Sequence, residues 1–234
     1  NDTKYTEGGP QAQAAGGKMK KNVYSVILSE SVVAAIDRLA YANGTNRSGM
    51  INRILAEYVS YETPEMKIHD TISRLERAIS ENQVFRLMAD TSDNTMSAKS
   101  SLVYKYNPSV RYSVELFRVP TGDGIGELRV SLRTQNATLI EYFSEFCGLF
   151  SAIEAKFGIT ARSEAGSGKF SRILCPRANS LSESKKITES KETVGELIAV
   201  YLNLFDSALK TFFEYTDNKS DCVSKITGLY SDYI

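Results

Sequence analysis

The sequence predicts an α+β protein in two parts. A short N-terminal strand with two helices precedes a larger C-terminal α+β domain with a small antiparallel sheet and long helices. Three observations support this: apolar residues alternate over residues 22–28, they recur with helical spacing on both sides of Gly44, and strand-like alternation returns after residue 100. A chain of 234 residues is long enough for two domains.

The composition is that of a globular protein, with 42% hydrophobic and 24% charged residues and a formal net charge of zero. No apolar run approaches the roughly 18 residues that a membrane span needs, and the start lacks the layout of a signal peptide. We therefore expect a cytoplasmic protein without membrane contact. Cys147, Cys175 and Cys222 are widely spaced, which favours reduced thiols over disulfides or a zinc site.

Residues 1–21 lack any hydrophobic periodicity and are expected to form a flexible N-terminal arm. Residues 22–62 form the next unit. Its strand is followed by Ser29, a good N-cap residue, and the first helix ends at Gly44. Asn46 can cap the second helix, which ends near Val59. About forty residues of this kind bury too little core to be stable alone, so a second copy is expected.

Residues 63–99 are predicted to connect the two parts. Pro64 suits the first turn of a helix over 64–89, and Ile68, Ile72, Leu75 and Ile79 form a stripe that would continue a dimer axis. Residues 90–99, rich in Ser, Thr, Asp and Asn, are expected to be a linker.

Residues 100–234 are predicted to form the larger domain. Strands are expected at 102–106, 111–119 and 126–133, followed by a helix that Asn136 caps and Gly158 ends. The helix would cover a three-stranded antiparallel sheet. Residues 162–190 read as a polar loop with one strand at 170–175, and helices are expected at 193–215 and 220–230.

The N-terminal unit resembles the ribbon-helix-helix family of DNA-binding proteins, which includes the Arc, MetJ and CopG repressors. The resemblance rests on the alternating strand, the capping Ser29, a helix of about four turns, Gly44 and a capped second helix, and it covers about forty of the 234 residues. It implies an intertwined dimer in which two strands, one from each chain, form a ribbon that enters the major groove of double-stranded DNA.

The resemblance also assigns contact residues. Leu28, just before the cap, must face the helices together with Val26 and Tyr24, so the outward side would contact base edges. The base-contacting residues are then Lys21, Val23, Ser25 and Ile27. Phosphate groups would be bound at the N-terminus of the second helix and by the arm, through Lys18, Lys20, Asn46, Arg47 and Ser48.

This sequence departs from the family in its base-contacting residues. These are usually polar in the family, but Val23 and Ile27 offer only apolar contact. Either the binding site is AT-rich and partly recognised by its shape, or the ribbon serves only dimerisation. Lys105, Arg111, Arg129 and Arg133 are expected on polar faces of the later strands, where a plain solvated sheet face is expected and a second nucleic-acid or anion surface is the alternative.

No catalytic constellation, metal-spaced set or cofactor motif is present, so neither an enzyme nor a cofactor is expected. Residues 166–169 resemble a phosphate loop only in part and are expected to be a flexible loop. His69, the only histidine, is expected to be exposed to solvent.

The expected partners are double-stranded DNA, a second copy of the chain or a higher homo-oligomer, and a protein bound through the C-terminal domain. The expected function is a dimeric transcriptional repressor associated with a prokaryotic nucleoid or plasmid. The alternatives are a plasmid centromere-binding (partition) or relaxosome accessory protein, and a structural interaction protein that uses the ribbon only to dimerise.

Overall fold

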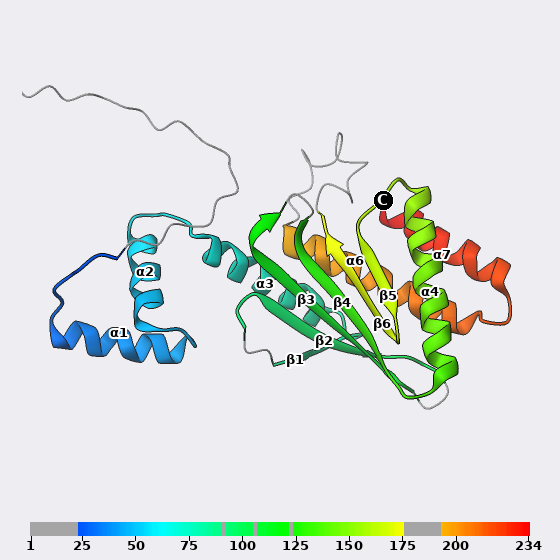
Figure 1. The fold of residues 1–234 in the computed structure, drawn as a ribbon, viewed down its shortest axis with the longest axis horizontal. Coiled ribbons are helices and arrows are strands. Elements are labelled where there is room, and N and C mark those ends of the chain that lie inside the picture. The colour runs from blue at the N-terminus through cyan, green and yellow to red at the C-terminus, as the bar shows by residue number, and fades with distance from the viewer. Residues whose placement is uncertain (1–22, 90–91, 105–106, 122–123, 176–192) are drawn as a thin grey trace, which may run out of the picture.

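The structure is a computed structural model that describes residues 23–89, 92–104, 107–121, 124–175 and 193–234 (Figure 1). It combines helices with one antiparallel sheet, so the predicted α+β class is confirmed. The predicted arm, with Lys18, Lys20 and Lys21, lies outside the described residues.

Two short helices form a small unit of their own near the start of the chain. These are α1 (Glu30–Ala42) and α2 (Arg47–Tyr58), and Gly44 between them has φ +61°. Ile36, Ala40 and Met50 form a cluster separate from the main core, with Ile51 packed against it. The two predicted helices are confirmed. The strand predicted at 22–28 is not confirmed, because residues 23–29 form neither helix nor strand and Asn22 lies outside the described residues.

Helix α3 (Pro64–Glu81) begins as predicted, with Pro64 in its first turn and the Thr63 hydroxyl accepting the Met66 N–H. The prediction of a connecting helix up to residue 89 is wrong. Ile72, Leu75 and Ile79 are buried in the core of the larger domain. The periodicity identified an apolar face correctly, but the face packs within the chain.

The sheet has the strand order β1-β2-β3-β4-β6-β5, and every neighbouring pair is antiparallel. The strands are β1 (Arg86–Met88), β2 (Thr95–Ser101), β3 (Ser109–Thr121), β4 (Gly124–Arg133), β5 (Ser163–Gly166) and β6 (Lys169–Leu174). The predictions of β3, β4 and β6 are confirmed.

The predicted linker 90–99 is corrected, because its second half, from Thr95 to Lys99, belongs to β2. Met96 and Ala98 alternate with polar residues and are fully buried, while hydrogen bonds to β3 hold the strand in place. The strand predicted at 102–106 is also wrong in its described part: β2 ends at Ser101, and Leu102 and Val103 belong to the connection that follows.

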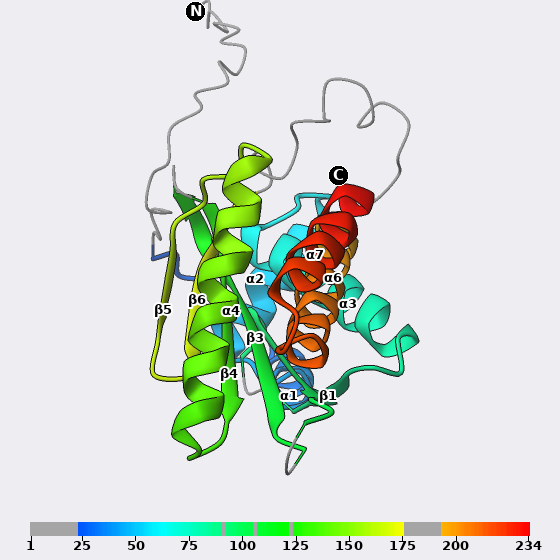
Figure 2. The same ribbon diagram turned by 90° about the vertical axis from the view of Figure 1, so that its right-hand side faces the viewer.

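The helices that the structure describes in the larger domain pack on one face of the sheet (Figure 2). Besides α3 these are α4 (Ala137–Lys156), α6 (Val194–Glu214) and α7 (Lys219–Tyr233). Side chains alternate along β4, with Leu128, Val130 and Leu132 buried toward the helices and Arg129 and Arg133 exposed on the opposite side. We call this opposite side, which none of the described helices covers, the open face.

Aromatic rings fill the space between sheet and helices. Phe205 of α6 lies at their centre, with its ring centroid 5.0 Å from Phe150, 5.2 Å from Phe146 and 5.2 Å from Phe170. Aromatic pairs in such edge and tilted arrangements stabilise a core beyond the area they bury.

Two ionic groups are buried among these rings. Arg172 of β6 pairs with Glu154 of α4, and the Tyr201 hydroxyl donates to Glu154 over 3.0 Å. Asp206 of α6 accepts the Tyr112 hydroxyl over 2.8 Å and pairs with Lys210 at 2.6 Å. Buried charges are tolerated when they are paired in this way. These groups therefore connect helices to sheet.

Residues 166–169, expected to be a flexible loop, are a tight turn between β5 and β6. Ser167 and Gly168 have φ of +50° and +71°, and Gly166 pairs with Lys169 across the hairpin. Positive φ at both central residues is typical of a type I′ turn, which suits the twist of the flanking strands. The resemblance to a phosphate loop thus has no structural basis.

Gly195 allows α6 to approach α3 closely. A Cβ at this position would lie 2.5 Å from the Thr71 carbonyl oxygen and 2.9 Å from the Leu75 nitrogen. We expect Gly195→Ala to lower the free energy of unfolding by about 1–3 kcal/mol, because one of the two helices must move. Urea unfolding followed by circular dichroism measures this change.

The matched control is Gly228→Ala in α7, where a Cβ meets nothing within 4 Å. There the higher helix propensity of alanine should raise stability by about 0.5–1 kcal/mol. Equal effects of the two substitutions would contradict the close approach of α3 and α6.

Candidate nucleic-acid interface

The N-terminus of α2 presents three of the five predicted phosphate-binding residues, Asn46, Arg47 and Ser48, on an exposed surface. The Asn46 side chain accepts the Gly49 N–H over 2.8 Å, which fixes the start of the helix. The backbone N–H groups of Arg47 and Ser48 bond to no described residue. Such groups, at the positive end of a helix dipole, are suited to an anion.

Arg47 is already engaged by a carboxylate. Its Nε lies 2.7 Å from Asp37 Oδ1 and its Nη2 lies 2.6 Å from Asp37 Oδ2, a two-pronged pair between α2 and α1. These hydrogen bonds lower the pKa of Asp37 below its ordinary value. As the chain stands, a phosphate must therefore compete with Asp37 for the Arg47 guanidinium.

The segment proposed to form the ribbon is exposed along its length. Val23 is 98% exposed and Ile27 is 101% exposed, while Tyr24 and Val26 are 79% and 71% exposed. Apolar side chains are rarely left uncovered in such a run. No hydrogen bond or ion pair among the described residues joins Ser25, which the sequence predicts to contact base edges, to the start of α2.

The apolar faces of α1 and α2 are covered only in part. Outside the small cluster, large apolar side chains remain between 37% and 88% exposed: Val32, Leu39, Ile54, Leu55, Tyr58 and Val59. The predicted stripes of both helices are thus wider than one chain can cover.

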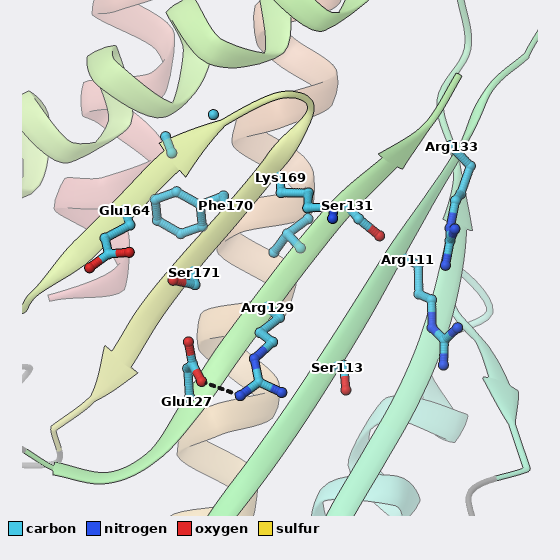
Figure 3. Close-up of a pocket in the computed structure, with 13 residues that line it drawn as sticks. Arg111, Ser113, Glu127, Arg129, Ser131, Arg133, Glu164, Lys169, Phe170 and Ser171 are labelled. Carbon is cyan, nitrogen blue, oxygen red and sulfur yellow. Dashed lines mark hydrogen bonds and ion pairs between the residues drawn. The ribbon is translucent and has the colours of Figure 1, made fainter. Parts of the chain in front are cut away.

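The open face carries a second group of basic residues (Figure 3). Arg111 of β3, with Arg129 and Arg133 of β4, lies on this face, as expected for polar positions of the strands. They line a hollow of about 590 Å³ together with Lys169 and several serines. Lys105, which was grouped with them, lies outside the described residues.

The sequence did not identify three further basic residues of this face. Arg86, Lys99 and Lys169 lie on β1, β2 and the start of β6. The first two belong to segments that were read as helix and linker, and Lys169 belongs to a segment read as a loop. Alternation of Met96 and Ala98 with polar residues was the one available signal for β2.

The cysteines and the single histidine lie apart from both surfaces described above. Cys147 and Cys222 are buried free thiols and Cys175 is partly buried, as predicted. His69 is exposed on α3. Within the described residues, no group of three or more His, Cys, Asp or Glu side chains is placed to hold a metal ion. In the same residues, no helix has the length and apolar character needed to cross a membrane.

Comparison with known proteins returned no match to any family model, curated protein or solved structure.

The pair between Arg47 and Asp37 generates a testable prediction. We expect Asp37→Asn to increase affinity for a DNA duplex several-fold, because it frees the guanidinium and removes a negative charge beside the phosphate position. Fluorescence anisotropy with a labelled 30-base-pair duplex measures the change.

Asp70→Asn is the matched control. Asp70 pairs with Arg74 on α3 at 2.8 Å, and its substitution changes the net charge by the same amount as Asp37→Asn. An equal gain in both variants would show that Arg47 has no special role.

Proposed function

We propose that the chain is a sequence-specific double-stranded DNA-binding protein that acts as a homodimer through a ribbon-helix-helix unit. The observation that carries the proposal is the uncovered apolar surface of residues 23–59. An exposed apolar segment, Val23 to Leu28, precedes two helices whose apolar faces are only partly buried. A second copy supplies both a pairing strand for the segment and a cover for the helices.

DNA binding is supported by the side chains that would point away from the helices in a paired ribbon. In a paired ribbon with Val26 and Leu28 turned toward the helices, Val23, Ser25 and Ile27 point outward together. A two-stranded ribbon fits the major groove. There Ser25 can hydrogen-bond to base edges, and Val23 and Ile27 can contact thymine methyl groups. The exposed start of α2 then faces phosphates with Asn46 and Ser48.

The simplest role for such a dimer is a transcriptional repressor. Partition and relaxosome accessory proteins would use the same DNA chemistry, and the larger domain would then bind a protein partner. Binding to one palindromic site or to an ordered array of many direct repeats distinguishes these roles.

Dimerisation is tested by Val26→Asp. Val26 is 71% exposed in the single chain, so the substitution should leave each chain folded. It would place a charge in the buried side of the ribbon, and we expect a shift from dimer to monomer in sedimentation velocity. The control Val103→Asp, at a position 85% exposed in the larger domain, should remain dimeric. A wild-type chain that is monomeric at micromolar concentration would refute the proposed dimer.

Sequence recognition is tested by Ser25→Ala on binding sites selected from genomic fragments by the wild-type chain. We expect the ratio of affinities for selected and random duplexes to fall about 5- to 100-fold, because Ser25 is the main hydrogen-bonding reader. Ser80→Ala, on an exposed turn of α3, is the control and should leave the ratio unchanged. Retention of no fragment by the wild-type chain would favour the reading in which the ribbon serves only dimerisation.

A further inference from the structure

Basic side chains form a row straight across the open face. The strand register places Arg86 of β1 opposite Lys99 of β2, and Lys99 opposite Arg111 of β3. The row continues through Ser131 of β4 to Lys169 of β6. We call these five positions the cationic row.

Like charges in directly opposite positions destabilise a sheet, so such an arrangement needs a reason. No carboxylate of the described residues lies within 4 Å of the basic groups in the row. The acidic residues of the face are engaged elsewhere: Glu115 and Glu127 pair with Arg129 at 3.0 and 2.5 Å, and Glu164 pairs with Arg162. The charge of the row is therefore uncompensated within the described structure.

Hydroxyl groups alternate with these cations. In the next row along the strands, Ser113 and Ser171 lie on the same face as Arg129, whereas Ser97 in this row is buried and is not available to a ligand. On the other side of the row, Arg133 pairs with Ser109 and adds another cation without a carboxylate partner in the described structure. Arginine, lysine and serine donors side by side are the groups that proteins use to hold phosphate oxygens.

The shape and composition of the face favour the backbone of duplex DNA. The row crosses strands spaced about 4.8 Å apart, hence roughly 19 Å in all. One DNA strand carries about five phosphates over that length, at about 3.4 Å each. The cationic row and the two rows beside it hold no aromatic side chain for stacking on unpaired bases. They also lack the aromatic anchors typical of a protein interface.

We propose that the open face, through the cationic row and Arg133, is a second DNA-binding surface that grips the phosphate backbone. The choice of DNA as the polyanion rests on the proposed function. The ribbon would then read sequence, while the face adds contacts that depend on salt and not on sequence.

The test compares two full-length triple variants with equal loss of charge. The face variant is Arg111→Gln, Arg133→Gln and Lys169→Gln. The control is Arg77→Gln, Lys156→Gln and Lys225→Gln, which are exposed helix positions on the other side of the sheet. Anisotropy is measured with a labelled 30-base-pair duplex of arbitrary sequence between 50 and 200 mM salt.

Each lost phosphate contact should reduce the slope of log affinity against log salt by about 0.9, so we expect a reduction of about 2 to 3 in the face variant. The affinity at 100 mM salt should fall at least ten-fold. The control variant should lie close to the wild-type chain. Equal slopes in the two variants would overturn this inference while leaving the ribbon intact as the DNA-binding element.

Two further outcomes separate the proposals. If Val26→Asp leaves duplex binding unchanged while the face variant loses it, the ribbon proposal fails and the second surface stands. A wild-type chain that binds no duplex at 50 mM salt refutes both.

The same titration with labelled poly-glutamate tests an alternative occupant of the open face. If the face variant loses more affinity for poly-glutamate than for the duplex, the face binds an acidic protein segment and the inference is overturned.

Discussion

The described helices of the larger domain pack on the same side of its sheet, and this arrangement determines which side chains of the sheet are buried. Alternation along each strand then separates residues into two populations. Apolar side chains such as Val130 and Phe170 face the helices, and the ring of Phe170 packs against that of Phe205. Most polar side chains of the strands lie on the other side, which no helix of the described residues covers.

Burial on one side also explains the ionic groups inside the core. Arg172 lies on the buried side of β6 together with Phe170 and Leu174, whereas Ser171 and Ile173 point to the other side and are only partly buried. An arginine in that position requires a carboxylate, which Glu154 of α4 supplies, and hydroxyls from Tyr201 and Tyr230 complete the group. Replacing one member would leave the others buried without a partner, so the four residues are expected to depend on one another.

Elements specified by local chemistry were predictable from the sequence. Asn136 and Thr193 cap their helices through side chains that accept N–H groups three residues further on, and both starts were identified. The short strands were missed for a physical reason: β2 is built from Ser, Ala, Thr and Lys around a single Met, and its stability comes from the neighbouring strands. The stripe of α3 was recognised, but periodicity does not tell which surface an apolar face will meet.

The candidate interface likewise combines features that local sequence patterns predict with contacts that only the tertiary structure shows. The exposed positions of Asn46, Arg47 and Ser48 followed from a capping pattern, whereas the pairing of Arg47 with Asp37 is a tertiary contact between residues ten apart. The basic residues of β3 and β4 were assigned to a polar face correctly. Their neighbours Arg86 and Lys99 joined them only through the strand register, which no local pattern reveals.

The N-terminal helix pair and the larger domain have separate hydrophobic clusters. The smaller cluster contains Ile36, Ala40 and Met50, too little to hold a unit of this size folded by itself. If a second chain completes it, the folded fraction of this unit rises with protein concentration, while that of the larger domain does not. The abundance of the chain would then set how many of its copies are competent to bind, so that synthesis of the protein is itself a control on its activity.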